Sequence, residues 1–319
     1  VVHREDDRWH WIADSYPANA VSLRAIADGN FVVVDITDGG KKVIAEVDYS
    51  SASVTLYEGA IYLVQSASWQ VERLDWTGRK AFVRSVEVDY YTDAIDYTKL
   101  KVLAEFEAAQ HATGRCANGE VHVVRRVAGY KKIRYYTHEN IGYGPVNLPD
   151  HEMHTTAVWW EVAPDALDRA FGDRFAALDG FLGAAHALHH MAALASLAEL
   201  RDIGRSVGDG EAGWSANRDA SGRGVAHDLS GEPVDVTSGR QPFHPAVYLY
   251  DNFPGGIGIS APLYDLRETI VDRALDLVTR CECAHGCPAC IGPVLPPDPR
   301  QRHSPKRAAI TVLGLMRGA

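Results

Sequence analysis

The sequence predicts an α+β protein, with a β-rich N-terminal small barrel or sandwich followed by an α/β domain that carries a long helix and a four-cysteine zinc site. Three observations favour this class. Short β-branched runs separated by turns fill the first hundred residues. One long stretch with helical periodicity lies in the second half of the chain. Four of the five cysteines lie close together near its end. We therefore expect two domains, residues 1–100 and residues 101–319.

The strands expected in the first domain begin with Phe31–Ile36, which ends before the turn sequence Asp38-Gly39-Gly40. Five further strands are predicted from the same alternation of apolar runs and turn residues: Val43–Asp48, Ser53–Leu56, Ala60–Gln65, Trp69–Asp75 and Lys80–Val88. Thr77-Gly78 predicts a hairpin turn between the last two. Strands this short, at this spacing, are typical of a small barrel or sandwich.

The second domain is expected to mix strands and helices. Its predicted strands are Val102–Ala109, Glu120–Val127, Tyr130–Thr137, Thr155–Val162 and Pro245–Asp251. Helical sequence begins at Pro164, and an apolar stripe of period 3.6 runs from Phe171 to Ala195. Two more helices are expected, Leu263–Arg280 and Lys306–Arg317. Residues 204–240 are rich in Gly, Ser, Asp and Arg and show no periodicity, which predicts a long, flexible loop.

Composition limits the function. The 319 residues carry a net charge of −10, which argues against a protein whose whole surface binds nucleic acid but leaves room for a local basic track. No apolar run reaches the ~18 residues of a membrane span. Clustered cysteines without a secretion signal indicate a reducing, cytoplasmic compartment. Because Val1 leads directly into what reads as structured sequence, we expect the chain to be part of a longer protein.

The cysteine cluster reads Cys281-x-Cys283-x3-Cys287-x2-Cys290. Four thiolates at this spacing can converge on one tetrahedral ion, and four protein ligands leave no open position, so we expect a structural Zn²⁺ site. An iron–sulfur cluster is the chief alternative, since it also takes four cysteines. His285 could replace a sulfur, and unliganded thiols remain the simplest alternative. Cys116 stands alone and is expected to be a buried thiol.

Two weaker motifs leave alternatives open. The stretch Asp251–Ile259 contains Gly255-Gly256 and could cradle a phosphate on backbone N–H groups, although a tight turn between a strand and a helix is the favoured reading. Asp251 with Asp202 could bind a divalent ion, but no third ligand is evident. His186 and His190 lie four residues apart on one helical face, and ordinary core or surface histidines are favoured over a metal pair.

A basic segment, residues 115–138, holds six Lys/Arg and one acidic residue. Such cations suit phosphates, and interleaved tyrosines can stack on bases. A solvated hairpin face is the equally favoured alternative, since neighbouring strand residues point to opposite sides. A second basic stretch follows the cysteines. The nucleic-acid-binding candidates from both are Arg125, Arg126, Lys131, Lys132, Arg134, Tyr135, Arg302 and Lys306. No catalytic residue is predicted, because the sequence contains neither a Walker A loop nor an Asp-Glu-x-His box.

Several segments in order carry a family resemblance: Asp14-Ser15-Tyr16-Pro17, Glu46–Tyr49, Glu58–Tyr62, Val88–Asp93, Met153–Thr156, Tyr250-Asp251 with Pro254–Gly258, and the cysteine cluster. Together they resemble the C-terminal region of MrfA/YprA-like superfamily 2 DEAD/DEAH-box DNA helicases, including the MrfA zinc-binding domain. The resemblance spans nearly the whole chain apart from residues 204–240. The four cysteines stand at the family's motif positions, which implies that they are the zinc ligands.

The resemblance implies an accessory domain of an ATP-dependent 3′-to-5′ DNA helicase in DNA repair. It would guide single-stranded DNA and support motor domains of the same full-length chain, where ATP and Mg²⁺ would bind. It also implies a cytoplasmic protein, nucleoid-associated if bacterial, and no membrane partner. Two other functions stay open, namely a module that recruits repair proteins and, less favoured, a metal-dependent nuclease.

Overall fold

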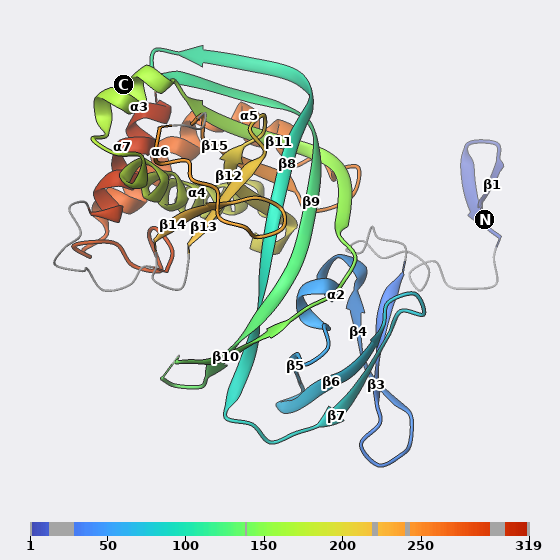
Figure 1. Ribbon diagram of the computed structural model, residues 1–319. Coiled ribbons are helices and arrows are strands. Elements are labelled where there is room, and N and C mark those ends of the chain that lie inside the picture. The colour runs from blue at the N-terminus through green and yellow to red at the C-terminus, as the bar shows by residue number, and fades with distance from the viewer. Residues whose placement is uncertain are drawn as a thin grey trace.

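The computed structural model describes residues 2–12, 29–137, 139–218, 223–239, 243–293 and 304–317. The first of these ranges forms a two-stranded hairpin of β1 (Val2–Glu5) and β2 (Arg8–Trp11). The following strands form a five-stranded and an eight-stranded sheet (Figure 1). Most helices gather beside the larger sheet, together with a four-cysteine cluster. The predicted α+β class with a four-cysteine site is confirmed.

The five-stranded sheet consists of β3 (Asn30–Asp35), β4 (Lys42–Asp48), β5 (Ile61–Val64), β6 (Ala67–Asp75) and β7 (Lys80–Ser85), in the order β4-β3-β7-β6-β5. The strands β3 and β7 pair in parallel, and the other pairs are antiparallel. Its core contains Phe31, Leu56 and Tyr57. The predicted strand Ser53–Leu56 is wrong, because α2 (Tyr49–Thr55) occupies that place and buries Ala52 and Ser53. Packing overrides the β-branched composition of this segment.

The eight-stranded sheet has the order β10-β9-β11-β15-β12-β13-β14, with β8 paired to β9 at one side. Its strands are β8 (Tyr90–His111), β9 (Gly114–Arg134), β10 (Asn140–Pro145), β11 (His151–Val162), β12 (Ile203–Asp209), β13 (Trp214–Arg218), β14 (Gly224–His227) and β15 (Ala246–Asp251). The long β8–β9 hairpin runs from the helical part of the molecule to the five-stranded sheet (Figure 1). The predicted domain boundary after residue 100 falls inside β8, and the two-domain division stays a prediction.

Helices cover one side of the larger sheet. They are α3 (Pro164–Ala170), α4 (Arg174–Ser196), α5 (Ser260–Asp265), α6 (Arg267–Arg280) and α7 (Pro305–Arg317), with a 3₁₀ turn η1 (Leu200–Asp202). A Cβ at Gly180 of α4 would come within 2.7 Å of the Ala308 carbonyl oxygen on α7. A Cβ at Gly183 would come within 2.8 Å of Ala309 Cβ. These glycines therefore let α4 and α7 pack closely, and Phe181 and Leu188 fill the core beside them.

The structure corrects the prediction of a flexible loop over residues 204–240. Much of that segment is sheet, since it contains β12, β13 and β14. Large apolar residues are scarce there because small ones are needed. The Tyr250 ring lies so close to Gly204 that a Cβ at this position would come within 2.1 Å of the ring. A Cβ at Gly208 would likewise clash with the Trp214 carbonyl oxygen. These strands therefore lack the alternation of bulky apolar and polar side chains by which a strand is recognised in a sequence.

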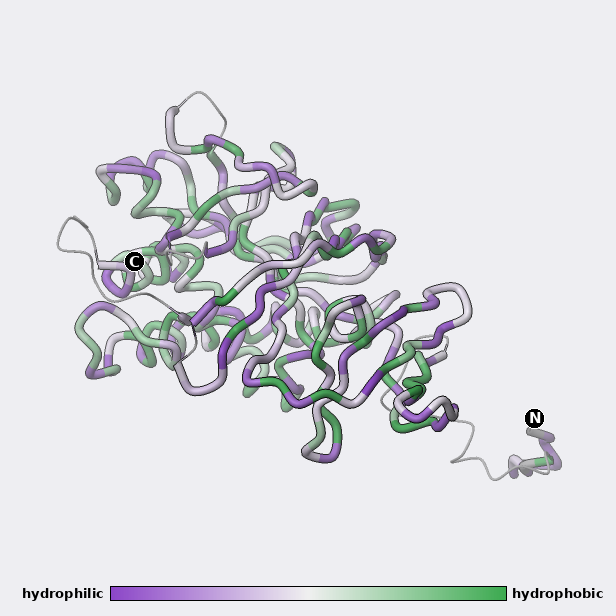
Figure 2. Tube along the Cα trace, turned by 60° about the horizontal axis from the view of Figure 1, so that its bottom comes forward, coloured by the Kyte–Doolittle hydropathy of each residue, from purple (hydrophilic) through white to green (hydrophobic). Residues whose placement is uncertain are grey.

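Hydrophobic stretches are short and interrupted along the trace (Figure 2). Within the ranges that the structure describes, no helix combines the length and apolarity needed to cross a membrane.

Candidate metal centre and nucleic-acid groove

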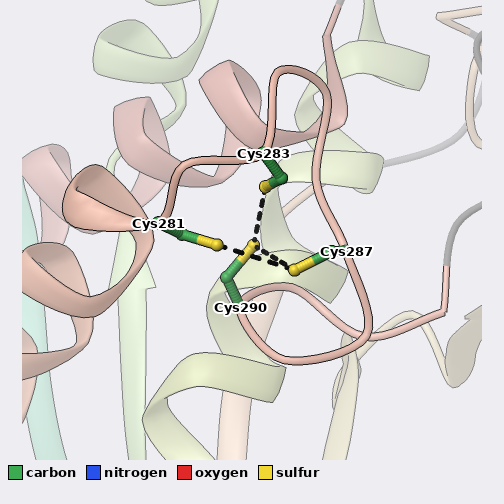
Figure 3. Close-up of side chains that lie close together, drawn as sticks. All are labelled: Cys281, Cys283, Cys287 and Cys290. Carbon is green, nitrogen blue, oxygen red and sulfur yellow. Dashed lines mark hydrogen bonds between the residues drawn. The ribbon is translucent and has the colours of Figure 1, made fainter.

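The four cysteine side chains turn toward one centre (Figure 3). The Sγ atoms of Cys281 and Cys287 are 3.6 Å apart, those of Cys283 and Cys290 3.5 Å, and those of Cys287 and Cys290 3.7 Å. All four lie within 4.8 Å of one another. A tetrahedral ion with Zn–S bonds near 2.3 Å needs sulfurs about 3.8 Å apart. The arrangement therefore fits a Zn²⁺ ion with four thiolate ligands and no open coordination site.

Local sequence explains how the loop turns around this centre. Helix α6 ends at Arg280, and Cys281 leaves it with extended backbone. Gly286 has a φ of 119°, which favours glycine, directly before Cys287. The Cys287 carbonyl then accepts the N–H groups of Cys290 and Ile291, each at 3.1 Å. This turn brings the second pair of cysteines back toward the first pair.

Lys306 closes the loop from α7. Its Nζ donates to the carbonyl oxygens of Cys281 and, at 2.8 Å, Cys283, while its backbone N–H donates to the His285 carbonyl. Only 9% of Lys306 is exposed. The ammonium that was expected to contact nucleic acid is thus engaged by the cysteine loop, and its DNA contact stays a prediction. Arg302, the other candidate in this stretch, lies outside the described residues.

The thiols differ in their readiness to ionise. The backbone N–H of Cys283 stabilises the thiolate of Cys281 and lowers its pKa to about 7. Burial raises the pKa of Cys290 to about 12. A divalent ion would have to displace the proton of such a buried thiol, so metal affinity should rise with pH. His285 is exposed and stands outside the converging group of described residues, whereas Cys116 is buried as expected.

The glycine loop after β15 is held by a carboxylate of its own chain. Asp251, 1% exposed, accepts at Oδ2 the N–H groups of Ile257, Gly258 and Ile259 at 2.9, 3.0 and 3.2 Å. Thr156 donates to the same oxygen at 3.2 Å. A phosphate would compete with Asp251 for these N–H groups. The structure therefore supports the tight turn rather than the phosphate cradle.

Most of the basic candidates on the β8–β9 hairpin engage neighbours at the surface. Arg126 pairs with Asp150 through two contacts of 2.7 Å. Arg134 lies 3.3 Å from Asp89 and 3.4 Å from Glu139. Two further candidates make ring contacts: Lys132 lies over the Tyr90 ring at 5.5 Å, and Tyr135 packs on Tyr91 at 5.7 Å.

Arg125 and Lys131 instead line hollows beside strands of the larger sheet. The first hollow, about 380 Å³, lies between α2, β12 and β15 and includes Arg125. The second, about 400 Å³, includes Lys131 and meets the first at Asp96 and Asn217. The Asn217 side chain donates to the Asp96 carbonyl at 3.3 Å and so marks the ridge between them.

A third hollow, about 350 Å³, adjoins the second and shares Ile95, Tyr97 and Tyr143 with it. We call the three hollows together the groove. Its lining includes residues that sequence reasoning missed: Tyr97, Tyr143, Arg205, Asn217 and Asn252. Their common signal, polar or aromatic type near a basic strand, is too frequent in proteins to have identified them.

Comparisons with known proteins agree with this geometry. Residues 184–291 match a family model, the MrfA Zn-binding domain, and this range contains all four cysteines. Together with the converging thiols, this match confirms structural Zn²⁺ as the cofactor. The ATP-dependent helicase YprA of Bacillus subtilis is 34% identical over 92% of this chain and 35% of its own length. The ATP-dependent helicase HRQ1 of Saccharomyces cerevisiae is 23% identical over 91% of this chain and 26% of its own.

Solved structures show the same relationship. The crystal structure of the DUF1998 helicase MrfA bound to DNA matches 99% of this chain and 38% of the MrfA chain, with a TM-score of 0.58 and 32% identity. Another crystal structure of the DUF1998 helicase MrfA matches 90% of this chain and 36% of the MrfA chain, with a TM-score of 0.54 and 29% identity. The chain thus spans about a third of the length of the proteins that it resembles.

Proposed function

Because the chain belongs to the family of MrfA/YprA-like helicases and carries the zinc-binding domain of that family, we propose that it is the accessory region of an ATP-dependent DNA helicase. In this role it guides single-stranded DNA and supports the motor domains of the same full-length chain. The full-length protein would bind ATP and Mg²⁺ in its motor domains. It would move 3′-to-5′ along DNA and act in DNA repair. The proposal includes a cytoplasmic location, at the nucleoid if the source is bacterial.

The groove is the observation that carries the proposal. It combines the cations Arg125 and Lys131 with the aromatic side chains of Tyr97 and Tyr143. Tyr143 is 61% exposed, so its ring is accessible to a base. Such cations bind the phosphates of a strand, and any base can stack on an aromatic ring. Both contacts are independent of sequence, as is needed for a single strand that passes through the groove.

The four cysteines Cys281, Cys283, Cys287 and Cys290 are the proposed ligands of the zinc ion. The ion has a structural role, since its four protein ligands would leave no site for a reaction. It fixes the loop that joins α6 to the segment before α7. Both helices pack on α4, whose other neighbours include strands β12 and β13 beside the groove. The metal therefore supports the groove from behind.

Neighbouring lysines offer a matched test. We expect the double variant Lys131→Ala with Lys132→Ala to weaken binding of single-stranded DNA and to flatten its salt dependence, because phosphate contacts release counterions. Lys131 lines the groove and Lys132 lies over Tyr90 outside it. The single variant Lys131→Ala should therefore carry most of the loss. Titration of a labelled oligothymidylate at several salt concentrations measures both quantities. Unchanged binding by the double variant would remove the hairpin cations from the DNA path.

One observation favours a protein-interaction module as a second candidate. Leu103 and Phe106 of β8 are 44% and 61% exposed, and among the described strands β8 pairs with β9 alone. Such a strand can accept a partner's backbone. Partner capture that persists when the chain no longer retains DNA would favour this function over strand guidance. The nuclease alternative has less support, because Asp251 is saturated by its own loop and Asp202 accepts the Glu199 N–H at 3.0 Å.

A further inference from the structure

Arg205 stands out among the basic residues of the groove. It lies on β12 and lines the first hollow, with part of its surface exposed to solvent. Its Nη1 donates to Nδ1 of His186 at 3.0 Å, so its described partner is a neutral acceptor and not a carboxylate. The pKa of Arg205 is lowered, first by lost hydration in the hollow and then by the nearby positive charge of Arg218. Asp48, Asp96 and Asp202 also line the hollow, but none of them is a described hydrogen-bond partner of Arg205, so its guanidinium can pair with an anion.

His186 fixes the direction of this guanidinium. Burial, followed by the charge of Arg205, lowers the pKa of His186 to about 3, so the ring is neutral near pH 7. Because Nδ1 accepts from Arg205, the ring proton must be on Nε2. One Nη of Arg205 is thus occupied by the protein, and further N–H donors of the fork remain for a ligand.

The cysteine loop fixes His186 in turn. Gly292, which follows the last cysteine by two residues, approaches the imidazole so closely that a Cβ would lie 3.0 Å from Nδ1. The Pro288 carbonyl also faces the ring. Ile291 is 1% exposed and packs beside Gly183, one turn before His186 on α4. An unbroken series of contacts therefore joins the metal loop, α4 and β12 to the hollow.

Arg125 lies in the same hollow and is already committed to the protein. Its Nη2 donates to Tyr250 Oη at 3.3 Å and to Asn252 Oδ1 at 3.4 Å, and its Nε lies 3.6 Å from Asp96. It contributes positive charge, whereas Arg205 has donors to spare. The hollow has about 380 Å³, which is within the range of small-molecule sites and sufficient for a phosphate with its sugar.

We propose that Arg205 binds a phosphate group in this hollow and that His186 is its positioning residue. The favoured source is a phosphodiester of the single strand, in which case the inference rests on the proposed function and assigns it a specific contact. A free phosphate offers the same chemistry. The planar guanidinium fork suits either one, because it can donate two parallel hydrogen bonds to a phosphate.

The test compares four variants of the 319-residue chain. Arg205→Gln removes the charge, and Arg273→Gln makes the same change on an exposed residue of α6 outside the groove. His186→Leu removes the acceptor for Arg205, whereas His186→Asn places an amide oxygen near the position of Nδ1. Each is titrated with labelled oligothymidylate at several salt concentrations, and separately with inorganic phosphate by calorimetry. Zinc content and circular dichroism check that each variant folds.

We expect Arg205→Gln to weaken oligothymidylate binding about tenfold or more, since a charge-assisted contact is lost. The slope of log K against log salt should fall by about 0.7, the value of one phosphate on a single strand. His186→Leu should weaken binding in the same direction, and His186→Asn should restore most of it. Arg273→Gln should bind as the unchanged chain does.

The outcomes separate this inference from the proposed function. In one outcome, Arg205→Gln weakens the binding of oligothymidylate and of phosphate no more than Arg273→Gln does. That outcome would overturn the inference and leave strand guidance standing. Phosphate binding that depends on Arg205, in a chain that does not bind oligothymidylate, would support the phosphate site and overturn strand guidance. A chain that binds neither ligand would overturn both.

Discussion

The five-stranded sheet, residues 30–85, and the cysteine lobe, which comprises α6, the loop 281–293 and α7, keep their shapes by different means. In the sheet, Phe31, Leu56 and Tyr57 are almost fully buried around a shared core. In the loop 281–293, Cys290 and Ile291 are buried but no helix or strand is formed. Burial of apolar surface stabilises the first region and also holds α6 and α7 against α4, whereas the loop between these helices depends on a metal ion and on Lys306. The two regions should therefore respond differently to the same perturbation.

The largest expected effect is that of Cys287→Ser. Loss of one thiolate should abolish zinc binding and unfold the cysteine lobe, because metal-binding free energy on the order of 10 kcal/mol is folding free energy in such sites. Amide hydrogen exchange should show lost protection in α6 and α7 while β3 and β7 stay protected. Cys116→Ala, which changes a buried thiol outside the cluster, should keep the metal. A soluble, metal-free Cys287→Ser chain with native protection would contradict the comparison.

The converse perturbation is Phe31→Ala in the five-stranded sheet. Truncating this fully buried ring should cost about 3–5 kcal/mol of unfolding free energy and leave the zinc content unchanged. Denaturant titration followed by zinc analysis measures both. Phe106→Ala on exposed β8 is the control and should change stability by no more than about 0.5 kcal/mol. If Phe31→Ala released zinc, the two regions would form one cooperative unit.

A smaller effect is expected for Lys306→Met, which keeps most of the side-chain volume but removes the ammonium from the carbonyls of Cys281 and Cys283. Stability should fall by about 2 kcal/mol, since two carbonyl groups lose a charged donor. Zinc should also pass to a chelator faster. Arg307→Met, at the exposed neighbouring position, is the matched control. Equal chelation rates for the two variants would mean that Lys306 has no part in holding the loop.

The same contrast explains what could be predicted from sequence. The cysteine cluster is recognisable because all four ligands fall within a single short segment, so their spacing already encodes the tetrahedral geometry. The β-rich nature of the first region follows from its β-branched runs. The segment containing β12–β14 was missed because Gly204 and Gly208 must be small to admit Tyr250 and Trp214. Because glycines occupy these closely packed positions, the sequence of the segment shows no regular spacing of hydrophobic residues.

The groove could not be predicted in the same way, because its residues come together only in the fold. Arg205 and Lys131 lie on strands far apart in the sequence, and Asn217 separates their hollows. Lys306 was assigned to nucleic acid from its basic neighbours, but tertiary contact directs its ammonium to the metal loop. Charge along a sequence shows where cations are available, and packing decides which of them face a ligand.

Zinc-edge X-ray absorption on the purified chain tests the central claim most directly. The account predicts one zinc per chain, coordinated by four sulfur atoms at about 2.3 Å and by no water. It also predicts that Cys281→Ser, Cys283→Ser, Cys287→Ser and Cys290→Ser each abolish this signal. A chain without zinc, an iron–sulfur spectrum, or a zinc shell that contains oxygen or nitrogen would contradict it.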